Sequence, residues 1–189
     1  MLNIVIIEMA ACETTLESCV VGLGHQCLKI ADSGQLLALL QQATPDLVMV
    51  SVTSPADELL ADLQALNRHT PIPVVLFAKT CAEDRYARVL EAQVSEFIVN
   101  DLNYTRLPSS ILIAKARFKQ QQSLKNALEE ARTQLEDRKQ IDRAKAILIK
   151  TRNFTENEAY HTLRKLAMDR NITLGEMARN VIAMADLLK

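Results

Sequence analysis

The chain has 189 residues, of which 49% are hydrophobic and 24% are charged, and its formal net charge at pH 7 is −1. This composition excludes a disordered or collagen-like chain, and the length allows one domain of about 100–150 residues with a smaller second one. No apolar run reaches the about 18 residues of a membrane-spanning helix, and the first residues lack the basic flank of a signal peptide. The four cysteines show no metal-ligand spacing, so we expect a protein of the reducing cytoplasm without a membrane partner.

The charge is distributed unevenly along the chain. Residues 1–105 hold 5 Lys and Arg against 13 Asp and Glu, a net charge of −8, whereas residues 106–189 hold 17 against 10, a net charge of +7. Such asymmetry indicates two units with different partners. The basic half makes a polyanion a candidate partner.

Apolar, β-branched runs alternate with helix-like segments through residues 1–105. The run at residues 2–7 is typical of a strand buried on both faces, and Gly22 and Gly24 mark the end of a first helix. The predicted strands are residues 2–7, 26–30, 46–52, 74–77 and 96–99, and the predicted helices are residues 11–23, 35–42 (with Ser33 as cap), 57–66 and 83–92. The alternation predicts an α/β fold, a doubly wound five-stranded parallel sheet with helices on both faces.

Ligands of such folds bind at the carboxyl ends of the strands. Glu8 with Met9 follows the first strand, Ser51 and Phe77 lie at the ends of the third and fourth strands, and Asn100 with Asp101 follows the fifth. This layout resembles the receiver domain of two-component response regulators. That family has two acidic residues that hold Mg²⁺, a phospho-accepting Asp, a Thr or Ser, and a Lys followed by Pro at these places.

The resemblance holds in layout but not in chemistry. Met9 replaces one acid, Ser51 replaces the phospho-acceptor, Phe77 the hydroxyl residue, Asn100 the lysine and Asp101 the proline. Phosphoryl transfer to aspartate needs a carboxylate nucleophile and a divalent cation, and one remaining carboxylate binds Mg²⁺ weakly. We therefore predict a pseudo-receiver at residues 1–105 without catalytic residues, metal or cofactor. The alternative is a shifted alignment in which Asp46 or Asp57 is the acceptor.

Residues 106–150 predict one long helix. The segment contains no Gly and one Pro, and apolar side chains recur at three- to four-residue spacing in two rows, which are offset across Gln120-Gln121-Gln122. Such a helix would be about 65 Å long and cannot bury its apolar stripe on a small domain. The pattern favours a coiled-coil homodimer through a linker at residues 106–137, and an antiparallel hairpin within one chain is the alternative.

The last residues predict a small three-helix bundle. Thr155 with Glu158 and Thr173 with Glu176 form two capping boxes, each of which begins a helix. Three apolar faces can close the bundle: Ile141, Ala144, Ile147 and Leu148; Ala159, Leu163, Leu166 and Ala167; and Leu174, Met177, Ala178, Val181, Ile182 and Ala185.

Basic side chains lie outside these faces, and Phe154, Tyr160 and His161 are the only rings after Phe118. A broad stacking platform for single strands is therefore disfavoured, while a loop held by Arg and Lys with at most one stacked base fits better.

Residues 138–189 resemble the ANTAR domain of the AmiR and NasT transcription antitermination regulators. The similarity rests on residues 138–148 (RKQIDRAKAIL), residues 158–165 (EAYHTLRK) with Ala167 and Met168, and residues 174–178 (LGEMA) with Val181 and Ile182. Ala146 departs from the family, which usually has Gly there. Residues 182–188 are most like the nitrate-assimilation regulators of the NasT type.

The resemblance implies an RNA-binding protein that recognises hairpins in nascent leader mRNA and prevents a terminator from forming. Lys145 and Arg164 fall on family positions and are the first candidates for RNA contact. Further candidates for RNA contact are chosen by charge alone: Arg138, Arg143, Lys150, Arg152, Lys165, Arg170 and Arg179. The resemblance also implies control by a sensor or sequestering protein, as in NasT-type systems, and a role in nitrate or nitrite assimilation.

Two other functions remain open from the sequence. Thr173 onward could be the recognition helix of a DNA-binding regulator, although only Arg179 and Asn180 there could read base edges. A coiled-coil scaffold would bind proteins alone. An enzyme is disfavoured because the sequence shows no triad, metal cluster or glycine-rich phosphate loop.

Overall fold

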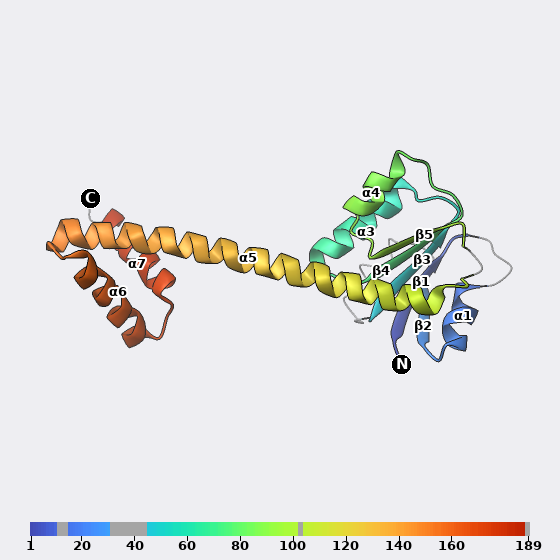
Figure 1. Cartoon of the computed structure of the whole chain (residues 1–189), viewed down its shortest axis with the longest axis horizontal. Coiled ribbons are helices and arrows are strands. Elements are labelled where there is room, and N and C mark those ends of the chain that lie inside the picture. The colour runs from blue at the N-terminus through green and yellow to red at the C-terminus, as the bar shows by residue number, and fades with distance from the viewer. Residues whose placement is uncertain (11–14, 31–44, 102–103, 188–189) are drawn as a thin grey trace. The chain divides into compact units, whose positions relative to one another are not determined.

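The computed structural model describes residues 1–10, 15–30, 45–101 and 104–187. The chain divides into two compact units, Met1–Gln122 and Ser123–Lys189 (Figure 1). The predicted helix at residues 35–42, its cap Ser33 and the first residues of the predicted helix at 11–23 lie outside the described residues.

The first unit is built on a five-stranded parallel sheet with the strand order β2-β1-β3-β4-β5. This is the flavodoxin-like doubly wound order, so the predicted fold class is confirmed. The core strands are buried along their whole length because both faces of the sheet are covered. The strands are β1 (Asn3–Glu8), β2 (Gln26–Ile30), β3 (Leu47–Val52), β4 (Val74–Ala78) and β5 (Glu96–Val99).

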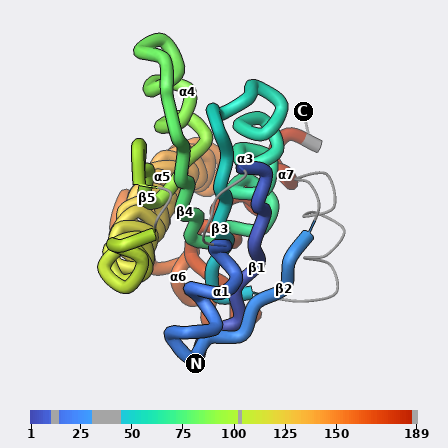
Figure 2. The backbone as a smooth tube through the Cα atoms, turned by 90° about the vertical axis from the view of Figure 1, so that its right-hand side faces the viewer, coloured from blue at the N-terminus to red at the C-terminus, as the bar shows by residue number. Residues whose placement is uncertain are grey.

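Helices cover the two faces of the sheet (Figures 1 and 2). On one face α3 (Asp57–His69) and α4 (Arg85–Glu91) pack on a core that includes Leu63 and Val89. On the other face lie α1 (Leu16–Gly22), which Thr15 caps by accepting a hydrogen bond from the Ser18 backbone N–H, and the first turns of α5. Gly24 has a φ of 78°, which suits glycine at the predicted helix stop.

A single helix, α5 (Leu107–Arg152), runs through 46 residues, as the sequence predicted. Leu107, Ile111 and Ala114 are buried against the sheet. Beyond that contact the apolar row is exposed on the single chain, with exposed fractions of 66% at Leu124, 52% at Leu128 and 58% at Leu135.

The second unit is the predicted three-helix bundle, formed by the end of α5 with α6 (Glu156–Arg170) and α7 (Leu174–Leu187). Both capping boxes are present: the Thr155 and Thr173 hydroxyls accept from the backbone N–H groups of Glu158 and Glu176, whose carboxylates accept in return. Leu166 is wrong as a core prediction because it is 36% exposed. The buried core consists of Ala144, Leu163, Ala167, Met177, Ala178 and Ile182.

Candidate nucleic-acid interface and the pocket at the sheet edge

Ser51, which the sequence predicted at the phospho-acceptor position of a receiver domain, is closed off from solvent. It lies on β3 beside Glu8 of β1 in the parallel register, and it is fully buried. Its hydroxyl lies 2.8 Å from the hydroxyl of Tyr104. A hydroxyl with no exposed surface cannot be reached by a phosphoryl donor without a rearrangement of the structure.

Tyr104 packs against Ser51 and Phe77, a contact that the sequence analysis did not predict. Its ring stands edge-on to Phe77, with the centroids 5.2 Å apart and the planes at 86°. Its φ of 55° is unusual for a bulky side chain, and it lies just before α5 in a segment without a hydrophobic period. Tyr104 is held by contacts with residues distant in the sequence. The hydrophobic periodicity of the sequence therefore could not predict its position.

The one acidic residue left in the pocket, Glu8, is already neutralised. Its carboxylate accepts from the Leu16 backbone N–H at 2.7 Å and from Lys29 Nζ at 2.8 Å, and its side chain is 6% exposed. The hydrogen bond to Glu8 raises the pKa of Lys29. Met9 is exposed, and Asn100 is exposed with a φ of 63°. The described residues contain no group of three His, Cys, Asp or Glu side chains that could hold a metal.

The two alternative acceptors are engaged elsewhere. Asp46 precedes the first residue of β3, at the strand end opposite Ser51, and accepts from the Asn3 backbone N–H at 2.8 Å. Asp57 begins α3 and forms ion pairs with Arg88 at 2.6 Å and Arg85 at 3.5 Å. Neither carboxylate stands at the place that Ser51 holds on β3.

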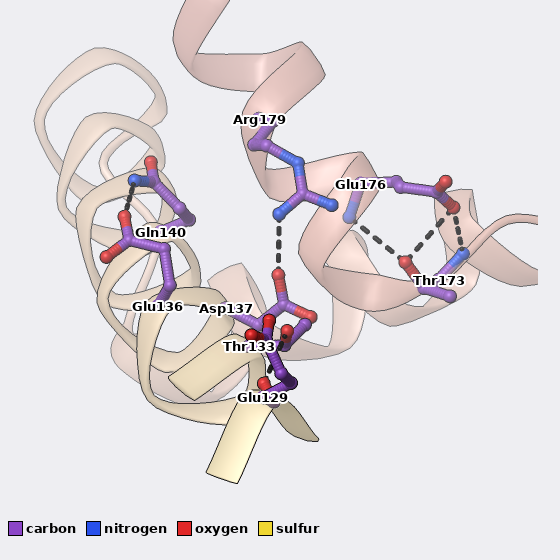
Figure 3. A network of polar contacts seen from close by, with 8 residues as sticks. All are labelled: Glu129, Thr133, Glu136, Asp137, Gln140, Thr173, Glu176 and Arg179. Carbon is purple, nitrogen blue, oxygen red and sulfur yellow. Dashed lines mark hydrogen bonds and ion pairs between the residues drawn. The ribbon is translucent and has the colours of Figure 1, made fainter. Parts of the chain in front are cut away.

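Three of the nine predicted RNA-contact residues form ion pairs within the second unit. Lys145 binds Asp142 at 2.8 Å and Glu156 at 2.9 Å, and its side chain is only 16% exposed. Arg143 pairs with Asp186 at 3.4 Å. Arg179 of α7 pairs with Asp137 of α5, next to the Thr173–Glu176 capping box (Figure 3).

The position of Asp137 also explains why residue 175 is a glycine. A Cβ at Gly175 would come within 2.3 Å of the Asp137 side chain, so α7 approaches α5 closely at this point. Arg179 is therefore part of the α5–α7 contact.

The other six predicted residues are exposed, and no ion pair is found for any of them in the part of the chain that the structure describes. Their charges are available to a polyanion, because surface cations without a partner lose no internal contact on binding. They lie on the last turns of α5 and on α6: Arg138, Lys150, Arg152, Arg164, Lys165 and Arg170.

Residues 129–182 match the ANTAR domain model, a segment that contains all nine predicted residues. The chain is 26% identical to the transcriptional regulatory protein PdtaR of Mycobacterium tuberculosis over 160 residues, which cover 84% of this chain and 78% of that protein. It is 32% identical to the nitrate regulatory protein of Klebsiella oxytoca over 83 residues, 43% of this chain and 21% of that protein.

Solved structures share the fold of the first unit. The receiver domain of a modulated diguanylate cyclase from Desulfovibrio desulfuricans G20 superposes with a TM-score of 0.54 at 16% identity, over 64% of this chain and 98% of that one. The receiver domain of a histidine kinase from Syntrophus aciditrophicus gives 0.53 at 21% identity, over 61% and 91%. Within the described residues, no helix is both long and apolar enough to span a membrane.

Proposed function

Because the chain is a transcriptional regulator that carries an ANTAR domain behind a receiver-like domain, we propose that it is an RNA-binding antiterminator. In this proposal it binds hairpin loops in nascent leader mRNA and keeps a terminator hairpin from forming. The observation that carries the proposal is the set of six exposed cations of the ANTAR segment, defined above, that form no ion pair within the described residues.

RNA fits this surface better than duplex DNA. A recognition helix in the major groove presents several polar side chains in its first turns. At the start of α7, Gly175 and Met177 are buried and Arg179 is held by Asp137. The exposed cations lie on α6 and the end of α5 instead, which supports a target other than the major groove.

The state of the pocket supports control through a protein partner. Ser51 is buried against Tyr104, and Glu8 is paired with Lys29, so the described residues of the pocket offer neither a carboxylate nucleophile nor an unpaired metal ligand for phosphorylation of the usual kind. The first unit, with its net charge of −8 over residues 1–105, would act as the docking surface for a sensor protein that sequesters the regulator. The 32% identity with a nitrate regulatory protein supports nitrate or nitrite assimilation genes as the target.

The exposed leucine row of α5 supports a homodimer. Leu124, Leu128 and Leu135 would be buried against the same row of a second copy, across the linker at residues 106–137. A dimer presents two ANTAR domains, at residues 138–189, to two hairpins of one leader. The second contact then gains from a high effective concentration.

A competition experiment tests the proposal. The full-length chain is bound to a leader RNA with two hairpins, recovered from transcripts that co-purify with it, and is challenged with duplex DNA of the same sequence at fixed salt. If duplex DNA does not displace the RNA, the result supports the proposed antiterminator function. Equal competition would favour the DNA-binding alternative, and no binding of either nucleic acid would favour a protein-only scaffold.

A further inference from the structure

One face of α6 combines a ring with basic groups. Tyr160 and Arg164 are four residues apart, as are His161 and Lys165, so the two pairs form adjacent rows on the helix. All four are exposed, while the opposite face buries Ala159, Leu163 and Ala167. We call these four residues the α6 platform.

Tyr160 is the one phenyl-type ring on the surface of the second unit's described residues. Its side chain is 39% exposed, whereas Phe154 is half-buried. The His161 ring stands at 70° to it with the centroids 6.0 Å apart, so the two rings form a T-shaped pair. A flat ring held in this way on a helix can stack on a base.

The charge around Tyr160 favours an anionic ligand. Arg164 and Lys165 form no ion pair with the described residues, including Asp169, which lies one turn after Lys165. Glu156 lies one turn before Tyr160 and would repel phosphate, but Lys145 binds its carboxylate. Glu158 lies one turn before His161, and its carboxylate accepts from the Thr155 backbone N–H in the capping box. The platform is therefore a ring beside two cations without an ion pair among the described residues, with Glu156 paired to Lys145.

We propose that the α6 platform is a single-base site for an unpaired nucleotide of the RNA loop. Tyr160 stacks on that base, and Arg164 and Lys165 bind the phosphates on either side of it. This inference rests on the proposed RNA-binding function. It goes further by assigning the contact with a base to Tyr160. A single exposed ring limits the site to one stacked base, so the rest of the affinity comes from phosphate contacts.

The test uses the full-length chain and a stem–loop RNA that the wild-type chain selects from a pool with a fixed stem and a randomised loop. Tyr160→Ala should weaken binding by about tenfold or more, and Tyr160→Phe should leave it nearly unchanged because the ring remains. Arg164→Ala should weaken binding to all selected loops and reduce the slope of log K against log salt by roughly 0.7–0.9. Arg132→Ala, an exposed arginine of α5 outside the platform, is the matched control for charge.

Abasic substitution along the loop identifies the stacked base. Removing one particular base should weaken binding of the wild-type chain and should have no further effect on Tyr160→Ala. Unchanged affinity of Tyr160→Ala, or an abasic effect that persists in that variant, would overturn the platform while RNA binding itself remains. Failure of the wild-type chain to retain any hairpin from the pool would instead overturn the proposed function.

Tyrosine emission gives a second readout that does not depend on the stability of an alanine variant. The chain contains three Tyr and no Trp, so Tyr160 contributes directly to its fluorescence. RNA should quench the wild-type emission, and that quenching should be lost in Tyr160→Phe, which still binds. The same quenching amplitude in both proteins would overturn stacking on Tyr160.

Discussion

The ammonium group of Lys145 on α5 lies 2.9 Å from the carboxylate of Glu156, the first residue of α6. Hydrogen bonds from Lys145 to Asp142 and then to Glu156 raise the pKa of the lysine. Lys145 was a first candidate for RNA contact, yet it is fixed between two carboxylates of its own unit. We infer that it affects RNA binding indirectly, by neutralising Glu156 beside Tyr160.

A double-mutant cycle separates the two roles of Lys145. We expect Lys145→Ala to weaken RNA binding because the Glu156 carboxylate is left without its cation near the bound phosphates. Adding Glu156→Gln should restore most of the affinity, measured by titration of a labelled hairpin. If Lys145 contacted RNA directly, the double variant would stay as weak as Lys145→Ala, and Glu156→Gln alone would bind more tightly than wild type.

Tyr104→Phe should destabilise the first unit. The substitution removes the hydroxyl that lies 2.8 Å from the buried Ser51 hydroxyl, and a buried polar group that loses its partner costs about 1–3 kcal/mol. Calorimetric unfolding of the full chain measures the effect. Tyr86→Phe is the control, because Tyr86 is exposed and its change should stay within about 0.5 kcal/mol. Equal stability of the two variants would show that the Ser51–Tyr104 hydrogen bond does not hold the pocket closed.

The two capping boxes should make the bundle sensitive to acid. Hydrogen bonds from the backbone and side chain of Thr155 lower the pKa of Glu158 below its usual 4.5, and those from Thr173 lower the pKa of Glu176 in the same way. A carboxylate whose pKa is lower in the folded state stabilises that state above pH 4.5, and the contribution is lost as the pH falls through the folded pKa.

Thermal unfolding of the second unit, followed by circular dichroism, checks this. The stability difference between wild type and the double variant Glu158→Gln with Glu176→Gln should be largest at neutral pH and should shrink below pH 4.5. A difference that is constant across this range would contradict the role assigned to the two carboxylates.

Substitution in the leucine row of α5 should dissociate the dimer. Leu128→Asn places an amide in the middle of the exposed row and should shift the chain toward monomer in sedimentation equilibrium. Binding to a single hairpin should be retained, while binding to a two-hairpin RNA should fall by roughly 100-fold as the effective-concentration gain is lost. Leu90→Asn, at an exposed leucine of α4, is the matched control, and an unchanged dimer in Leu128→Asn would place the interface elsewhere.

The strands of the first unit were predictable because each is a short apolar run between turn residues. The strand at residues 26–30 and the strand at residues 96–99 were predicted with the bounds that β2 and β5 have. The long helix and both capping boxes were also predictable from the sequence, since each depends on residues within a few positions of one another.

Contacts between distant residues were not predictable. Tyr104 meets Ser51 across 53 positions, and Lys145 meets Glu156 across a turn between helices. Charge alone therefore could not separate paired from available cations. Leu166 was assigned to the core by its spacing, although the folded bundle leaves it 36% exposed.

Transcription through a leader terminator tests RNA recognition by the ANTAR segment most directly. The template carries the leader recovered with the protein, and single-round transcription measures the fraction of full-length transcript. We predict that wild type raises read-through, that acetyl phosphate leaves this effect unchanged, and that Arg164→Glu with Lys165→Glu abolishes it. Normal read-through with the charge-reversed variant would contradict an RNA-binding role for these exposed cations.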